Sequence, residues 1–212
     1  MDSSVQLRRA TLEDIPEMID VMSSAFHDSV LDAKCFPPSD PMSRQTNDAA
    51  LTKALSDPAA HLLVAVDPSA PRILGWARWV RRLAPEPDAP PLAPLTPADF
   101  PPSGDGHLAA RFFNANADAR HRFLAGRPCW FLATIVVRHD AQRRGVGKLL
   151  MDYGVQRADQ EGWVAYTNAS AKGRGLYERY GFKTLAVSDF EPGITTWHML
   201  RDARKEEDQG QG

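Results

Sequence analysis

A glycine-rich, basic segment has the residue types and the spacing of a phosphate-binding turn. It covers residues 142–148 and reads Gln-Arg-Arg-Gly-Val-Gly-Lys. Gly145 and Gly147 lack the Cβ atoms that would keep a phosphate away from the backbone amides. The basic side chains of the segment add fixed positive charge. The chemistry that these residues could carry is therefore the binding of a phosphate-bearing ligand.

A buried strand and an amphipathic helix are expected on either side of this segment. The run Trp130–Val137 is apolar except for Thr134, which is typical of a strand covered on both faces. Apolar residues then recur at helical spacing from Val146 onwards, and Gly162 is placed to end that helix. The first-turn N–H groups of a helix have no intrahelical partner, and the helix dipole adds about half a positive charge there. Together these elements would position an anion at the start of the helix.

Two other phosphate-binding motifs fit the segment poorly. The nucleotide P-loop requires G-x-x-x-x-G-K-[ST], but Gln142 takes the first glycine position and Leu149 follows the lysine. The dinucleotide motif G-x-G-x-x-G has Leu150 in its third glycine position, and no acidic residue on a second strand suggests itself about 20 residues later. A third pattern, Gln/Arg-x-x-Gly-x-Gly/Ala, is matched at every specified position.

This third pattern resembles the acetyl-CoA pyrophosphate motif of the GNAT N-acetyltransferase superfamily. A downstream stretch, residues 175–182, reads Gly-Leu-Tyr-Glu-Arg-Tyr-Gly-Phe and resembles the Leu-Tyr-x-x-x-Gly-Phe signature of the same family. The resemblance covers roughly residues 60–200. It implies an α/β fold of the GNAT acyl-CoA N-acyltransferase type, with a mixed central sheet of about six to seven strands flanked by helices. It also implies acetyl-CoA as co-substrate and no metal.

The resemblance assigns roles to individual residues. In the family, the strands corresponding to Leu132–Val137 and Trp163–Thr167 splay apart, which frees backbone groups for the pantetheine arm. Amides near the end of the first of these strands are the candidates for binding the oxyanion. Tyr177 matches the tyrosine that protonates the departing thiolate, and it is the predicted catalytic residue. The predicted cofactor-binding residues are Ile135, Val136, Val137, Gln142, Arg143, Arg144, Gly145, Val146, Gly147, Lys148, Ser170 and Tyr177.

Two positions depart from the family pattern. Members often carry a glutamate on the central strand as base, but here Thr134 is the only polar side chain of that strand, and a threonine cannot be a base. Many members place an asparagine seven residues before the signature tyrosine. That position is Ser170 here, and Asn168 lies two residues earlier. No base is assigned, and the residues that could supply one are His27, Asp189, Glu191 and His198.

The predicted function is that of an acetyl-CoA-dependent N-acetyltransferase. An amine of a small molecule or peptide would attack the thioester directly. That amine must first lose a proton, because an ammonium of pKa about 10 is no nucleophile at neutral pH. The alternative is an acyl-CoA-binding, GNAT-like sensor or partner subunit that has lost the chemistry. The missing strand carboxylate favours the alternative, and the retained Tyr177 argues against it.

Composition excludes several other classes of function. The 212 residues are 43% hydrophobic and 25% charged, as in ordinary globular proteins. The net charge of −2 gives no general case for nucleic acid or an anionic membrane as partner. Cys35 and Cys129 match no metal or redox spacing, and no apolar run suits a signal peptide or a membrane span. We predict a cytoplasmic protein with an amine acceptor as its partner and leave a homodimer open.

The remaining pattern predicts a single domain over residues 1–200 and a flexible tail over 201–212. Besides the central strand and helix, we expect strands at 5–9, 61–67, 73–80, 163–167, 182–187 and 195–200. We expect helices after Thr11 to about His27 and over 43–55, 107–124 and 172–180, the last capped by Ser170.

Two proline-containing segments are predicted to be loops. Residues 28–42 carry three prolines, and the insertion 85–104 includes eight of the seventeen prolines of the chain. The insertion could lie near the acceptor site as a lid, or be a mobile loop. By the family resemblance, His27, Asp28 and Asp32 are candidate acceptor contacts. Trp76 and Trp79 are three residues apart and should face opposite sides of the sheet, one in the core and one at the acceptor site.

Overall fold

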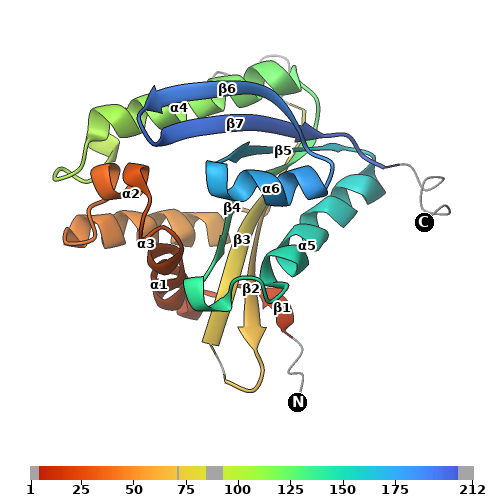
Figure 1. Cartoon of the computed structure of the whole chain (residues 1–212), viewed down its shortest axis with the longest axis horizontal. Helices are drawn as coiled ribbons and strands as arrows, with labels where there is room; N and C mark the ends of the chain where they lie inside the picture. The colour runs from red at the N-terminus through yellow and green to blue at the C-terminus, as the bar shows by residue number, and fades with distance from the viewer. Residues whose placement is uncertain (1–4, 71, 85–92, 205–212) are drawn as a thin grey trace.

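The computed structural model describes residues 5–70, 72–84 and 93–204. Within these residues, seven strands form one sheet in the order β1-β2-β3-β4-β5-β7-β6. Neighbouring strands are antiparallel except for β4 and β5, which run parallel. Helices lie on both faces of the sheet (Figure 1). The predicted α/β fold with a mixed sheet flanked by helices is confirmed.

Most elements lie where the sequence pattern predicts them, although α2 was not expected and β6 runs to Glu191, past the predicted end at residue 187. The strands are β1 (Gln6–Arg9), β2 (Ala60–Asp67), β3 (Arg72–Arg82), β4 (Cys129–Val137), β5 (Val164–Ala169), β6 (Lys183–Glu191) and β7 (Ile194–Arg201). The α-helices are α1 (Ile15–Ala25), α2 (Val30–Cys35), α3 (Pro41–Leu55), α4 (Gly106–Leu124), α5 (Val146–Glu161) and α6 (Ala171–Arg179). Short 3-10 helices cover Leu12–Asp14, Pro97–Asp99 and His139–Ala141. In the described part of the chain, no helix is long and apolar enough to cross a membrane.

The core divides between the two faces of the sheet. Helices α5 and α6 cover one face, and α1, α3 and α4 cover the other (Figure 1). We call the first the α5 face and the second the α4 face. Trp79 packs on the α5 face and Trp76 on the α4 face, so the prediction of opposite faces is confirmed.

Both tryptophans belong to the core. Trp76 is 2% exposed and its Nε1 donates to the carbonyl oxygen of Met18 at 2.8 Å. Trp79 is fully buried and donates to the carbonyl oxygen of Leu150 at 3.1 Å. The prediction that one of them lines the acceptor site is wrong, because a helix closes over each indole.

Strands β4 and β5 pair over only four residues and then part. Their ladder runs from Cys129–Val164 to Leu132–Thr167. Beyond that point β4 continues beside β3, and β5 pairs only with β7. A register shift in the β3–β4 ladder lies at the same level, and such bulges bend a strand. The predicted separation of the two strands is therefore present, and it leaves an open edge on β4.

The prediction of a loop over residues 28–42 is wrong. Helix α2 lies within it, with Ser29 as N-cap accepting from the amide of Asp32 at 3.2 Å, and Cys35 is fully buried. Helix α3 begins at Pro41, because a proline at the first helical position needs no N–H partner. The prolines therefore lie between α2 and α3 or at the start of α3, and they do not exclude either helix.

The segments of the two other boundary predictions lie partly outside the described residues. Residues 85–92 of the proline-rich insertion lie outside the described residues, and Pro97–Asp99 forms a 3-10 turn capped by Thr96. Strand β7 includes Arg201, which is 3% exposed and lies 2.7 Å from the carboxylate of Asp159. The domain thus extends past residue 200, and residues 205–212 of the predicted tail lie outside the described residues.

Candidate active site

The turn before α5 has an open, anion-binding backbone. Gly145 is the N-cap of α5 with φ of +80°, and Arg143 has φ of +61°. A Cβ built at Gly145 would meet nothing within 4 Å, so the backbone conformation is what requires glycine there. The first helical bond of α5 runs from the amide of Leu149 to the oxygen of Gly145 at 3.0 Å. The N–H groups of Val146, Gly147 and Lys148 have no intrahelical acceptor and remain for a ligand.

The basic side chains of the turn are held only loosely. Arg144 lies 4.0 Å from Asp67, and Lys148 lies 2.7 Å from Asp152 while 73% exposed. Exposed ion pairs contribute at most about 1 kcal/mol, so both cations can turn to a phosphate at little cost. Arg143 is exposed as well. The turn therefore fits a phosphate-bearing group such as the pyrophosphate of acetyl-CoA.

The open edge of β4 presents alternate backbone groups. The amide of Arg138 donates to Leu74 of β3 at 2.9 Å, and successive N–H groups of a strand point to opposite edges. The N–H groups of Ile135 and Val137 therefore face away from β3, toward the gap left by β5. Val136 lies two residues before Arg138, so its N–H faces β3 like that of Arg138 and is not available to a ligand. This geometry removes Val136 from the predicted cofactor-binding amides.

Gln142 lies against the same edge. Its Nε2 donates to the carbonyl oxygen of Val137 at 3.5 Å, which links the glycine turn to the end of β4. Ser170 caps α6, as predicted, by accepting from the amide of Gly173 at 3.3 Å. A Cβ built at Gly147 would lie 3.6 Å from Leu176 of α6 and 3.9 Å from Val137, so the turn, the end of β4 and α6 lie together. We call the region between them, beyond the last β4–β5 rung, the opening.

Tyr177 lies where the two strands part. It is 6% exposed, and its hydroxyl interacts with the side chain of Thr167. Thr167 in turn donates to the carbonyl oxygen of Leu132 at 3.0 Å, and these two residues form the last rung of the β4–β5 ladder. Burial raises the pKa of Tyr177 above its ordinary value, so the hydroxyl keeps its proton at neutral pH.

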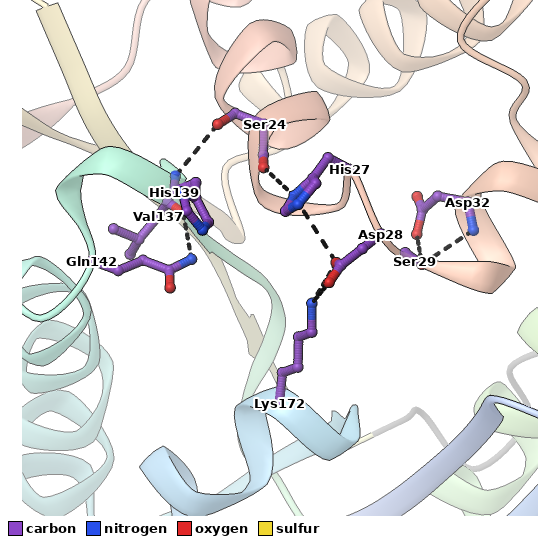
Figure 2. Close-up of polar contacts among 9 residues, drawn as sticks. All are labelled: Ser24, His27, Asp28, Ser29, Asp32, Val137, His139, Gln142 and Lys172. Atoms are coloured by element: carbon purple, nitrogen blue, oxygen red, sulfur yellow. Dashed lines mark hydrogen bonds and ion pairs between the residues drawn. The ribbon is translucent and has the colours of Figure 1, made fainter.

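A cluster of polar side chains lies across the opening on the side of α1 (Figure 2). Asp28, after α1, forms an ion pair with Lys172 in the first turn of α6. The Nδ1 atom of His27 lies 3.1 Å from the carbonyl oxygen of Ser24. The ring centroids of His27 and His139 are 5.4 Å apart. His27 and Asp28, two of the predicted acceptor contacts, are therefore brought to the opening. The third, Asp32, bonds to Ser29 within α2 at 2.5 Å.

Lys172 was missed by the sequence analysis, although a signal was present. A cation in the first turn of a helix is unfavourable with respect to the helix dipole, so it implies a nearby carboxylate. In the structure that carboxylate belongs to Asp28, which lies 144 residues earlier in the chain.

The other candidate bases have partners of their own. Asp189 accepts from the hydroxyl of Thr195 at 2.6 Å, and Glu191 forms an ion pair with Lys34. His198 is fully buried, and burial lowers its pKa. Its Nδ1 lies 2.9 Å from Oδ1 of Asn168, so that asparagine is directed to His198. Among the described residues, no group of three or more His, Cys, Asp or Glu side chains is arranged to hold a metal ion.

Residues 125–202 match the family model of the acetyltransferase (GNAT) domain. The match covers a little over a third of the chain. The matched region includes β4, the glycine turn, α5, α6 and the closing strands, and hence both sides of the opening. The family resemblance seen in the two sequence motifs is thereby confirmed.

Solved structures of acetyltransferases share the fold over most of the chain. One is described as "histone acetyltransferase HPA2 and related acetyltransferase" from Corynebacterium glutamicum, with 22% identity, a TM-score of 0.61, and coverage of 95% of this chain and 97% of that one. The polyamine N-acetyltransferase of Drosophila melanogaster has 14% identity and a TM-score of 0.64, covering 94% and 100%. An agmatine N-acetyltransferase has 14% identity and a TM-score of 0.65, covering 93% and 99%. At these identities the likeness shows a common fold.

Proposed function

We propose that this chain is an acetyl-CoA-dependent N-acetyltransferase that acts on an amine of a small molecule or peptide. The observation that carries the proposal is the juxtaposition of two binding features. An anion-binding helix start with a glycine at φ of +80° lies beside a β4 edge from which β5 has separated. The first suits a pyrophosphate, and the second offers free backbone groups to an extended pantetheine arm.

The residues of this chain can divide the work of acyl transfer. The amides of Ile135 and Val137 are fixed donors for the oxyanion that forms when the amine attacks the thioester carbonyl. Tyr177 supplies a proton to the departing thiolate, since its buried hydroxyl remains protonated. Neither role needs a carboxylate on β4, whose only polar side chain is Thr134.

His27 is the base that this geometry favours. When its Nδ1–H donates to the carbonyl oxygen of Ser24, 3.1 Å away, Nε2 is left as a proton acceptor. Its side chain is 56% exposed and lies over the opening (Figure 2), so it can exchange the proton with water. An amine that approaches from the α1 side would pass this nitrogen before it meets the thioester.

Replacing His27 by glutamine should lower turnover near pH 7 by about 10²–10⁴-fold, the usual contribution of a general base. The deficit should shrink as the pH approaches the amine pKa of about 10, because the amine then loses its proton without help. Initial rates of coenzyme A release across this pH range measure both effects. Asp189→Asn is the control and should behave as the wild type. An equal deficit at every pH would show that His27 is not the base.

The proposed function is tested first by binding. Acetyl-CoA at about 100 times its dissociation constant stabilises the fold by roughly 2.7 kcal/mol, which raises the midpoint of thermal unfolding by about 5–10 °C. ATP and NAD serve as comparators and should give smaller shifts. In Gly145→Glu the shift should disappear, because a carboxylate then occupies the turn and repels the phosphates.

The matched control for this variant is Gly162→Glu. Gly162 ends the same helix, has φ of +68°, and its added Cβ would also meet nothing within 4 Å. Both variants therefore bear a similar backbone strain, but only one places charge in the phosphate turn. If acetyl-CoA stabilised neither the wild type nor Gly162→Glu, the proposed function would be wrong.

An acyl-CoA-binding sensor or partner subunit is the second candidate. The absence of a carboxylate on β4 favours it. It predicts the same thermal shift but no release of coenzyme A with any amine. A cytoplasmic location and the absence of a nucleic-acid or membrane partner remain proposals from composition. A homodimer stays open.

A further inference from the structure

Three arginines gather on the α4 face of the sheet beside the opening. Arg78 and Arg82 are four residues apart on β3 and alternate with residues packed on the α5 face, so both point to the α4 face. Arg120 reaches the same place from α4. The Cζ atoms of Arg82 and Arg120 lie 5.6 Å and 4.6 Å from the centre of the Phe131 ring. One strand and one helix thus direct positive charge to one site, above an aromatic ring of β4.

These arginines have no carboxylate partner among the described residues. Buried Nε atoms of Arg78 and Arg82 lack any hydrogen-bond acceptor there. Burial lowers the pKa of Arg78, and it lowers the pKa of Arg120 to about 10; in both cases the nearby charge of Arg82 adds to the effect. The one acidic residue that acts on Arg78 is Asp57, which forms no ion pair with it. The cluster therefore carries uncompensated positive charge at half-buried positions.

An unpaired polar atom lies on the same helix. Asn116 is one turn before Arg120, is 5% exposed, and its Oδ1 has no donor within the described part of the chain. Buried polar groups normally have partners, and partly buried like charges are costly to bring together. A ligand with an anionic group and an N–H or O–H donor would satisfy both the arginines and the asparagine.

The cluster lies next to the place where the acyl group would be transferred. Arg78 is the register partner of Thr134, two residues beyond the rung at which β4 and β5 part. Phe131, beneath the other two guanidinium groups, is one residue before that rung. The phosphate turn belongs to α5, which covers the opposite face of the sheet. The arginines therefore face the acceptor side of the opening and not the side of the phosphate turn.

We infer that Arg78, Arg82 and Arg120 form a subsite that binds an anionic group of the acceptor. The substrate would then be an amine that also carries a carboxylate or phosphate group. This inference rests on the proposed function for the identity of the reaction, and on the unpaired arginines for the anion. Guanidinium groups bind carboxylate and phosphate through paired N–H donors, which a half-buried cluster without a carboxylate partner among the described residues leaves free. A purely cationic acceptor would be repelled from the same surface.

The subsite is tested first without any reaction. Inorganic phosphate is titrated against chloride at constant ionic strength, and thermal unfolding is followed in the Gly145→Glu background, in which the phosphate turn is disabled. We expect phosphate to raise the midpoint by about 2–4 °C. The shift should be lost in Arg120→Gln and in Arg78→Gln. Arg122→Gln, an exposed arginine on the same helix, is the matched control and should keep the shift.

Two outcomes of this titration would overturn the subsite. One is an equal phosphate response with and without Arg78 and Arg120. The other concerns Glu86 and Asp88, which lie outside the described residues. A phosphate response that appears only in the double variant Glu86→Gln, Asp88→Asn would mean that the chain's own carboxylates occupy the arginines.

Acceptor pairs that differ only in the anion then identify its source. Arginine is compared with agmatine and ornithine with putrescine, which test a carboxylate, and O-phosphoethanolamine with ethanolamine, which tests a phosphate. We expect kcat/KM to be at least about ten-fold higher for one class of anionic member, equivalent to about 1.4 kcal/mol. That ratio should fall toward one in Arg120→Gln. Preference for the cationic members that lack the anion would overturn the subsite but leave the acetyltransferase in place. An absent acetyl-CoA shift would instead remove the enzyme and leave the phosphate titration unaffected.

Discussion

Replacing Tyr177 by phenylalanine is expected to lower turnover by about 10²–10⁴-fold while acetyl-CoA still binds. The phenol is buried on the α5 face of the sheet and interacts with Thr167, which belongs to the last rung of the β4–β5 ladder. Without its proton, the thiolate of coenzyme A leaves unprotonated from a site that water reaches poorly. Rates of coenzyme A release and the thermal shift with acetyl-CoA separate the loss of chemistry from a loss of binding.

The control is Tyr153→Phe. The Tyr153 hydroxyl also has one side-chain partner, Nδ1 of His61 at 2.7 Å, but it lies toward β2, away from the opening. Each variant loses one partly or fully buried hydrogen bond, at a typical cost of about 1 kcal/mol of folding stability. Only Tyr177→Phe should lose turnover. If turnover in Tyr177→Phe equalled that of the wild type, the thiolate would be protonated by another group.

The part of the site that could be predicted from sequence is the part specified by local chemistry. Gly145 and Gly162 adopt positive φ at the two ends of α5, as their positions in the hydrophobic pattern required. Ser170 caps α6 because a serine before a helix accepts from its first-turn amides. These features depend on residues within one or two turns of each other, so a short stretch of sequence contains all the information.

The open edge of β4 was only half predictable. The sequence indicated that amides near Ile135, Val136 and Val137 would be free, but which of them face the gap depends on the register between β4 and β3. That register pairs Val136 with Trp76 and is set by packing across the sheet. The same packing buries both Trp76 and Trp79, which pattern alone could not decide.

The arginine subsite and the Asp28–Lys172 pair needed the tertiary structure. Arg78 and Arg82 carry a sequence signal, since basic residues four apart on a strand share one face. Nothing in the sequence shows that Arg120, on a helix beyond the proline-rich insertion, would join them. The absence of a partner for a charged residue is a property of the whole fold, and it can be recognised only when the described neighbours are known.

The packing of α5 on the sheet leads to the second large effect, at Gly154. A Cβ built at this position would lie 2.1 Å from Cε2 and 2.2 Å from Cδ2 of Trp79, far inside van der Waals contact. Trp79 cannot move aside easily, because it is fully buried and its Nε1 donates to Leu150 of the same helix. Glycine is therefore required by the close approach of α5 to β3. Alanine at this position must push the helix, and with it the phosphate turn, away from the sheet.

Gly154→Ala should thus destabilise the fold, although alanine is the better helix former. The gain in helix propensity is about 1 kcal/mol, and overpacking costs typically 1–3 kcal/mol or more. With a clash this short, we expect a net loss of about 2 kcal/mol or more, seen as a midpoint lower by about 4–8 °C and a weaker shift with acetyl-CoA.

Gly175→Ala is the control: its Cβ would approach nothing closer than 3.9 Å, so it should be neutral or stabilising. The double variant Trp79→Phe, Gly154→Ala should lose less than the sum of the single variants, since a smaller ring leaves room for the methyl group. Additive losses would mean that the two residues do not meet as the structure has them.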